Sequence, residues 1–196
     1  MGLPMSLLQE DKIRNCGLVT QMLVSTNTSQ PAGNEADLVR KINALFPEHL
    51  YRRIIDHGNN RASLILRIDG KNRGGLAFVG HIDTVAFGEE KAWKYPPLEA
   101  RIQDGVLYGR GAADMKSGVA AMITAAQCVV ASGCTPLEDL YFCFTADEEA
   151  GGTGVLAVMQ SRELACVREF IIAEPSQLKM GLCEKGALWL RVHVEG

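Results

Sequence analysis

Phe78-Val-Gly-His81-Ile-Asp83 and Phe144-Thr-Ala-Asp147-Glu148-Glu149 decide the fold of this chain, because each places polar side chains directly after an apolar run. Ile171-Ile-Ala-Glu174 repeats the pattern. Short apolar runs of this kind are typical of buried strands. In open α/β sheets, ligands and catalytic groups gather where the strands end. These stretches therefore predict one polar rim along the edge of a sheet.

The rest of the chain predicts alternating strands and helices. Expected helices cover residues 7–23, 34–45, 116–132 and 153–160. Expected strands cover 50–56, 62–68, 76–80, 140–145 and 170–173, and the last three are expected to be buried. Residues 70–75 are expected to form a turn. Asp104-Gly105 is a hairpin signal, and alternation over 187–195 predicts a half-exposed strand. The alternation as a whole favours an α/β layered fold.

Composition and charge exclude several classes of function. The net charge is -3 and the sequence pI is about 5.8, which gives no basic surface for nucleic acid or anionic lipid. We find no uninterrupted apolar run long enough for a membrane span and no secretory signal. The six cysteines form no C-x-x-C pair, which argues against a thiolate zinc site and favours a reduced, cytoplasmic setting.

His81 and Asp83 lie two residues apart at a strand end, so their side chains face the same side. A metal-bound imidazole is commonly held by a carboxylate that accepts its other N–H. The alternative is a histidine that caps a strand beside a solvated acid. This pair alone favours that alternative.

Asp114 lies in the glycine-rich stretch from Gly109 to Gly118, just before an expected helix. Such a loop can cradle phosphate at the helix N-terminus. However, the G-x-x-x-x-G-K-[ST] pattern is absent, and the carboxylate would repel phosphate. The pattern therefore favours a different interpretation of Asp114, a carboxylate that bridges two metal ions.

Glu148 and Glu149 follow one buried strand, and Glu174 follows another. Adjacent residues point in different directions, so one glutamate of the pair can ligate a metal while the other acts as a general base. Taken singly, each acid could be an ordinary solvated residue. Several carboxylates converging on one rim repel one another unless positive charge lies between them. A pair of divalent ions is the simplest source of that charge and indicates a hydrolase.

The order of these motifs resembles one family closely, from about Leu76 to the end of the chain. It is the metal-dependent amidohydrolase and peptidase family that contains acetylornithine deacetylase, succinyl-diaminopimelate desuccinylase, aminoacylase and glutamate carboxypeptidase. The most specific match is Asp104-Gly-Val-Leu-Tyr-Gly-Arg-Gly-Ala-Ala-Asp-Met-Lys-Ser-Gly118, supported by Gly80-His-Ile-Asp-Thr-Val85.

The resemblance implies a role for each site residue. The metal ligands it implies are His81, Asp114, Glu149 and Glu174, with Asp114 bridging both ions. Asp83 would orient His81, and Glu148 would be the general base and later the acid. The implied cofactor is Zn²⁺, two ions per complete site, with Co²⁺ as a substitute. The resemblance also implies a cis peptide between Asp114 and Met115.

The resemblance further implies a three-layer helix–sheet–helix fold with a mixed, mostly parallel sheet, the zinc-peptidase-like catalytic domain, here truncated. Residues 1–184 would form the N-terminal part of that domain, and residues 185–196 the first strand of an incomplete lid and dimerisation domain. In the family, a histidine from a later part of the chain ligates the second metal. That histidine has no counterpart here, and His49, His57 and His193 are not candidates for it. We expect weak or no activity from the chain alone, and a homodimer in the complete protein.

The expected function is amide-bond hydrolysis of an N-acyl amino acid, of the deacetylase or desuccinylase type, by metal-activated water with Glu148 as the base. Two alternatives stay open. One is a di-, tri- or carboxypeptidase that uses the same site on a short peptide. The other is a non-catalytic fragment that binds metal without turnover.

Overall fold

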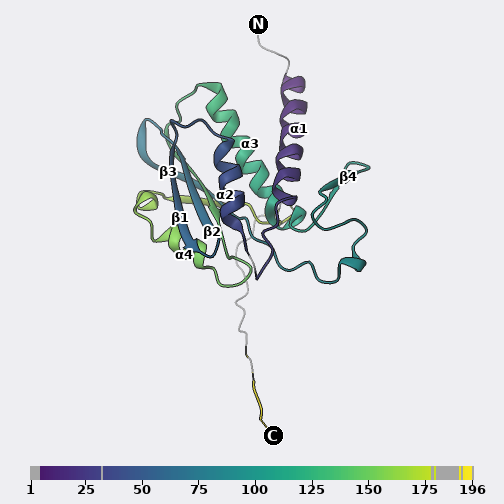
Figure 1. The fold of residues 1–196 in the computed structure, drawn as a ribbon. Coiled ribbons are helices and arrows are strands. Elements are labelled where there is room, and N and C mark those ends of the chain that lie inside the picture. The colour runs from purple at the N-terminus through teal and green to yellow at the C-terminus, as the bar shows by residue number, and fades with distance from the viewer. Residues whose placement is uncertain (1–4, 32, 178, 180–189, 191, 196) are drawn as a thin grey trace.

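The computed structural model describes residues 5–31, 33–177, 179, 190 and 192–195, and its centre is a five-stranded mixed sheet with the order β1-β2-β6-β3-β7 (Figure 1). The strands are β1 (Tyr51–Gly58), β2 (Arg61–Ile68), β3 (Asn72–His81), β6 (Glu138–Thr145) and β7 (Glu169–Ile172). Strand β2 pairs antiparallel with β1 and β6, whereas β3 pairs parallel with β6 and β7. The predicted mixed sheet is confirmed.

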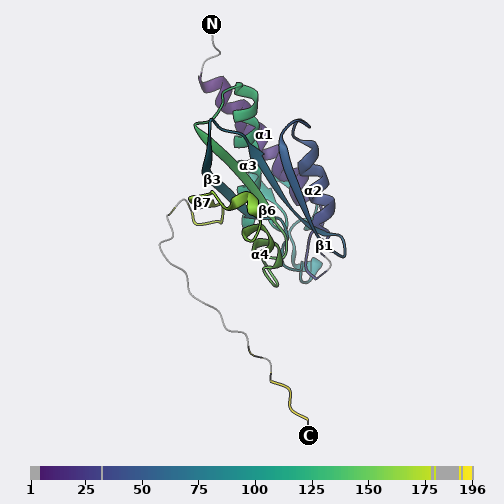
Figure 2. The same cartoon turned by 90° about the vertical axis from the view of Figure 1, so that its left-hand side faces the viewer.

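Helices cover both faces of this sheet, as Figures 1 and 2 show. One face carries α1 (Met5–Val24), α2 (Glu35–Ala44) and α3 (Ser117–Ser132), and the other carries α4 (Thr153–Met159). Because neighbouring strand residues point to opposite faces, Leu64 and Phe144 join the core under the first three helices, whereas Ile65 and Cys143 pack with Val158 of α4. The predicted three-layer arrangement is therefore confirmed.

Helix α3 is long and rich in apolar residues. The segment Ala112–Ser132, which contains it, is long and apolar enough to cross a membrane by length and composition. In this structure α3 packs against α1, β3 and β6, and Val119, Ile123 and Ala126 are fully buried. Its apolar character is thus explained by its place in the core.

A separate two-stranded hairpin stands apart from the main sheet (Figure 1). It consists of β4 (Arg101–Gln103) and β5 (Val106–Tyr108). The two residues between them, Asp104 and Gly105, both have positive φ, at 53° and 77°. Positive φ at both positions is the requirement of a type I′ turn, so the predicted hairpin is confirmed.

The prediction of a buried strand over Phe170–Ala173 is wrong in its burial. Strand β7 forms there, but it pairs only with β3 and ends the described sheet. Its apolar side chains are exposed, at 40% for Phe170, 48% for Ile171 and 55% for Ile172. An apolar run predicts a strand, but it does not say what covers the strand.

The turn predicted over residues 70–75 is also partly wrong, since β3 begins at Asn72. The pairing of β3 with β6 shifts register between Asn72 and Leu76, and Gly74 and Gly75 within that shift have φ near 110°. The glycines therefore mark an irregularity inside the strand instead of a turn before it.

The strand predicted over residues 187–195 falls partly outside the described residues. Among the described positions in that range, 190 and 192–195, none is in a strand. The proposed second domain, residues 185–196, lies mostly in the same undescribed part.

Candidate metal centre

The parallel strands β3, β6 and β7 bring the predicted site residues to one edge of the sheet. His81, the last residue of β3, pairs with Thr145 of β6, and Val79 pairs with Ile172 of β7. Glu148 and Glu149 therefore follow β6 at the level of His81, and Glu174 follows β7 beside it. This is the polar rim that the sequence predicts.

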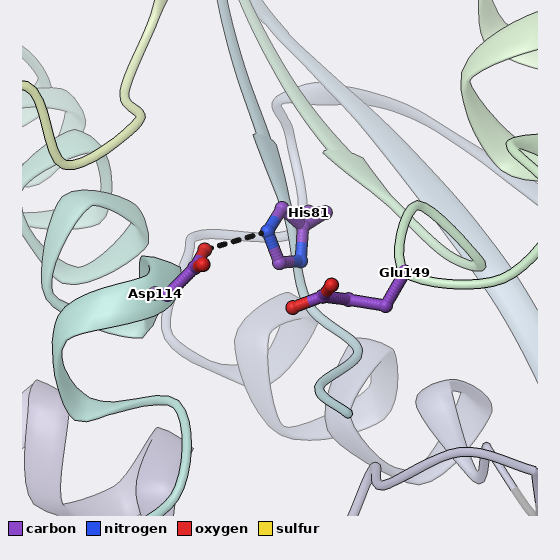
Figure 3. Close-up of side chains that lie close together, drawn as sticks. All are labelled: His81, Asp114 and Glu149. Carbon is purple, nitrogen blue, oxygen red and sulfur yellow. Dashed lines mark hydrogen bonds and ion pairs between the residues drawn. The ribbon is translucent and has the colours of Figure 1, made fainter. Parts of the chain in front are cut away.

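The imidazole of His81 is buried, with 2% of its surface exposed, and its Nε2 atom faces a group of carboxylates. Nε2 lies 3.1 Å from Oδ1 of Asp114, 3.6 Å from Oε1 of Glu174 and 3.9 Å from Oε2 of Glu148. Figure 3 shows Asp114 and Glu149 reaching toward His81 from different segments of the chain. The six predicted site residues thus lie together at this edge of the sheet: His81, Asp83, Asp114, Glu148, Glu149 and Glu174.

The other ring nitrogen of His81, Nδ1, faces Asp83. It lies 3.0 Å from the backbone oxygen of Asp83 and 3.6 Å from the carboxylate oxygen Oδ1. A carbonyl oxygen only accepts hydrogen bonds, so a neutral His81 carries its proton on Nδ1. The lone pair of Nε2 then points into the carboxylate group, as a metal ligand requires.

The fully buried carboxylate of Asp83 also holds the turn that carries the two glutamates. Its oxygens accept hydrogen bonds from the backbone N–H groups of Glu148 and Glu149, at 3.0 and 3.1 Å, and from the side chain of Gln30, at 2.9 Å. Burial alone would raise the pKa of Asp83, but the hydrogen bonds from His81, Gln30 and the Glu148 N–H outweigh it and lower the pKa. Asp83 is thus an ionised group that fixes both sides of the site.

Asp114 enters the site from the turn Ala112–Lys116, between β5 and α3. The peptide between Asp114 and Met115 is cis, as the resemblance implies. The buried Met115 lies beneath the site, where its sulfur accepts the backbone N–H of His81 at 3.2 Å. The Asp114 side chain is 57% exposed, so it faces the open side of the cluster.

The charges of the cluster are unbalanced without a cation. Burial raises the pKa of Glu149 and of Glu174, and the negative charge of Asp114 adds to both shifts. Burial would lower the pKa of His81, but Asp83, Glu174 and Glu148 outweigh it and raise the pKa to about 9. The raised pKa of His81 is thus due to negative charge nearby, and that charge adds to the effect of burial on the pKa of Glu149 and Glu174.

The donor atoms fit a divalent metal ion. Ligand atoms of His81, Asp114 and Glu149 all lie within 4.8 Å of one another. One imidazole nitrogen with carboxylate oxygens is a donor set that zinc accepts. A cleft of about 160 Å³ opens beside these donors and is lined by Asp114, Glu149, Thr84 and Arg110, among others. A small molecule can therefore reach the cluster from outside.

Sequence reasoning missed two polar residues beside the cluster, Gln30 and Lys116. Lys116 is buried, and its ammonium group donates to the backbone oxygen of Thr26 at 3.0 Å. Burial lowers the pKa of Lys116 to about 7, although Asp83 and Glu35 act in the opposite direction. Lys116 stands inside the quoted glycine-rich motif, whereas nothing local to Gln30 marks it as a neighbour of Asp83.

Comparison with known proteins gives a family and a set of relatives. The model of peptidase family M20/M25/M40 matches residues 77–188. A succinyl-diaminopimelate desuccinylase from Wigglesworthia glossinidia brevipalpis is 49% identical over 78 residues, which cover 40% of this chain and 21% of that protein.

Solved structures share the fold at low sequence identity. Human carnosine dipeptidase 1 matches with a TM-score of 0.65 and 21% identity, over 85% of this chain and 39% of that one. The M20 family metallo-carboxypeptidase Sso-CP2 from Sulfolobus solfataricus matches with a TM-score of 0.63 and 16% identity, over 76% of this chain and 36% of that one. The chain thus spans well under half the length of these relatives.

Proposed function

Since the chain belongs to peptidase family M20/M25/M40, we propose that it is a metal-dependent hydrolase that cleaves the amide bond of N-acyl amino acids, of the deacetylase or desuccinylase type. The observation that carries the proposal is the position of His81. Its Nε2 lies 3.1 Å from Asp114 and 3.6 Å from Glu174, and its Nδ1 lies beside Asp83. The local identity to a desuccinylase supports the choice of substrate class.

In this proposal His81, Asp114, Glu149 and Glu174 hold divalent metal, two Zn²⁺ ions in the complete site, with Co²⁺ as a substitute. Bound metal would polarise the amide carbonyl and acidify water. Asp83 keeps the proton of His81 on Nδ1 and so leaves Nε2 free to bind. Because Asp83 also holds the N–H groups of Glu148 and Glu149, one buried carboxylate orients the groups on both sides.

Glu148 is the proposed proton carrier. Its carboxylate is half-exposed and lies 3.9 Å from Nε2 of His81, farther than the carboxylates of Asp114 and Glu174. From this position it can take a proton from attacking water and deliver it to the leaving amine. A carboxylate in these two roles is ordinary general base and acid catalysis.

The proposal extends to the organisation and location of the protein. We assign residues 1–184 to the catalytic domain and residues 185–196 to the start of a lid domain. The five cysteines among the described residues form no disulfide, which supports a reduced, cytoplasmic setting.

A substrate panel tests this function. The purified protein is stripped of metal, reloaded with Zn²⁺ or Co²⁺, and incubated for hours with N-acetylornithine, N-succinyl-diaminopimelate and simple dipeptides while amine release is followed. We expect metal-dependent release from the acylated amino acids, even if turnover is slow, and its loss in Glu148→Gln. Release from dipeptides alone would make the protein a peptidase. Tight metal binding with no hydrolysis of any substrate would make it a metal-binding protein.

A further inference from the structure

We propose that Arg61 is a positioning residue for the two glutamates of the site, because it ties Asp147, the residue before Glu148, to the buried Glu35. This assignment rests on the proposed function, since it gives Arg61 a part in placing Glu148 and Glu149. Neither Arg61 nor Glu35 lies in the motifs at the strand ends that indicated the metal centre.

The guanidinium group of Arg61 is fully engaged by two carboxylates. Its Nη2 lies 2.7 Å from Oε1 of Glu35, its Nε lies 3.2 Å from Oε2 of the same side chain, and its Nη1 lies 2.9 Å from Oδ1 of Asp147. Arg61 begins β2 and Glu35 begins α2, so the group links two elements to the turn after β6. A forked, planar donor suits two carboxylates at once, which a lysine ammonium does not.

Glu35 makes this link rigid. Its side chain is completely buried, and the side chain of Arg61 is only 20% exposed. A buried carboxylate is strongly unfavourable unless it is paired and hydrogen-bonded. The two-point contact with Glu35 therefore holds Arg61 in one orientation and aims its remaining nitrogen at Asp147.

Through Asp147, the contact with Arg61 also restrains the turn after β6 that carries Glu148 and Glu149. Its second carboxylate oxygen accepts the Thr153 hydroxyl at 2.6 Å, and its backbone oxygen accepts the N–H groups of Gly151 and Gly152. Asp147 has a φ of 67°, a conformation that few residues other than glycine adopt, so its side-chain contacts help to maintain it. Asp83 holds the next two N–H groups, which leaves the direction of Glu148 and Glu149 fixed from both ends of the turn.

Three variants of the purified protein test the role. Arg61→Ala removes both contacts, Arg61→Lys keeps the charge without the fork, and Arg53→Ala is the matched control. Arg53 lies on the neighbouring strand β1 and forms an ion pair of similar length, 2.7 Å, with Glu163, away from the site. Zn²⁺ affinity by calorimetry, kcat and KM on N-succinyl-diaminopimelate, and amide hydrogen exchange at Glu148 and Glu149 are measured for each.

We expect Arg61→Ala to lower Zn²⁺ affinity or kcat by about 10- to 100-fold, the usual cost of losing a group that supports metal ligands. KM should change little, and the amides of Glu148 and Glu149 should exchange faster. Added guanidinium ion should restore part of the loss, Arg61→Lys should stay impaired, and Arg53→Ala should match the parent.

A folded Arg61→Ala protein with parental Zn²⁺ affinity, kcat and amide exchange would overturn the proposal. If Arg61→Ala does not fold, Asp147→Asn takes its place, because it preserves the contact of Arg61 with Glu35. Asp147→Asn should show the same losses, and parental values would again overturn the role. If the parent hydrolyses nothing, the proposed function fails, while Zn²⁺ affinity and amide exchange still decide the role of Arg61.

Discussion

The carboxylate of Asp83 lies on the Nδ1 side of His81, 3.6 Å from that nitrogen, whereas Nε2 on the opposite side of the ring faces the remaining carboxylates. The two ring nitrogens therefore have separate partners. Nδ1 is held by a buried acid, and Nε2 faces the carboxylates of Asp114, Glu174 and Glu148.

Asp83→Asn tests this relationship. Every hydrogen bond from Gln30, Glu148 and Glu149 to Asp83 needs an acceptor oxygen, and an amide NH₂ would set a donor against a donor. We expect a loss of about 1–3 kcal/mol in the free energy of unfolding and a fall of about 10- to 100-fold in Zn²⁺ affinity. Urea unfolding and calorimetry measure the two effects. The exposed Asp69→Asn is the control and should change neither; equal effects in both variants would contradict the role of Asp83.

Glu148 and Glu149 are adjacent, and their variants should differ in kind. Glu148→Gln should lower kcat by about a hundredfold to ten-thousandfold with Zn²⁺ content unchanged, because Glu148 is the proposed proton carrier. Glu149→Gln should instead reduce Zn²⁺ content, because its carboxylate belongs to the ligand cluster with His81 and Asp114. Metal analysis beside steady-state kinetics separates the two. The reverse pattern would exchange their roles.

Glu163 gives a pH dependence of stability that is independent of the metal centre. Burial would raise its pKa, but hydrogen bonds from Arg53 and Tyr51 outweigh that effect and lower the pKa to about 2. A lowered pKa means that the stabilisation is complete above the ordinary value of 4.5 and is lost as the pH falls toward 2. Glu163→Gln should therefore be less stable than the parent at pH 6, and the difference should shrink steadily in acid. Urea unfolding of both proteins across this pH range measures the difference. If the difference in free energy of unfolding stayed constant with pH, the titration of Glu163 would not be its cause.

Two glycines in helices should respond oppositely to alanine. At Gly118 in α3 an added Cβ would lie 2.2 Å from the backbone oxygen of Ala173, the residue before Glu174, whereas at Gly17 in α1 nothing lies within 4 Å. We expect Gly118→Ala to cost about 1–3 kcal/mol through overpacking and to weaken Zn²⁺ binding through Glu174. Gly17→Ala should stabilise the helix by about 0.5–1 kcal/mol. Thermal unfolding of both variants measures the two effects, and equal stabilisation would mean that Gly118 and Ala173 are less closely packed than the structure shows.

The sequence was sufficient to predict the candidate site residues that lie just after the end of a strand. His81, Glu148 and Glu174 each follow an apolar run, and parallel pairing of β3 with β6 and β7 puts such positions at one edge whatever the loops do. Asp114 needed the glycine-rich motif, because its turn lies between the hairpin and α3 instead of at a strand end of the main sheet.

Other features depend on contacts between distant parts of the chain. Gln30 reaches Asp83 and Arg61 reaches Asp147 only after the sheet and helices have assembled, so no local pattern marks either pair. The exposure of β7 has the same origin. Its apolar residues satisfy the pattern of a buried strand, but burial is set by what packs on both sides of it.

The most direct measurement is a crystal structure of the purified protein grown with Zn²⁺, with anomalous diffraction recorded at the zinc absorption edge. We predict an anomalous peak about 2.0–2.2 Å from Nε2 of His81 and from a carboxylate oxygen of Asp114, with Glu149 or Glu174 completing the protein ligands and Asp83 remaining on the Nδ1 side. The absence of zinc from this cluster at saturating Zn²⁺, or its binding only at other histidines, would contradict the assignment of a metal centre to this edge of the sheet.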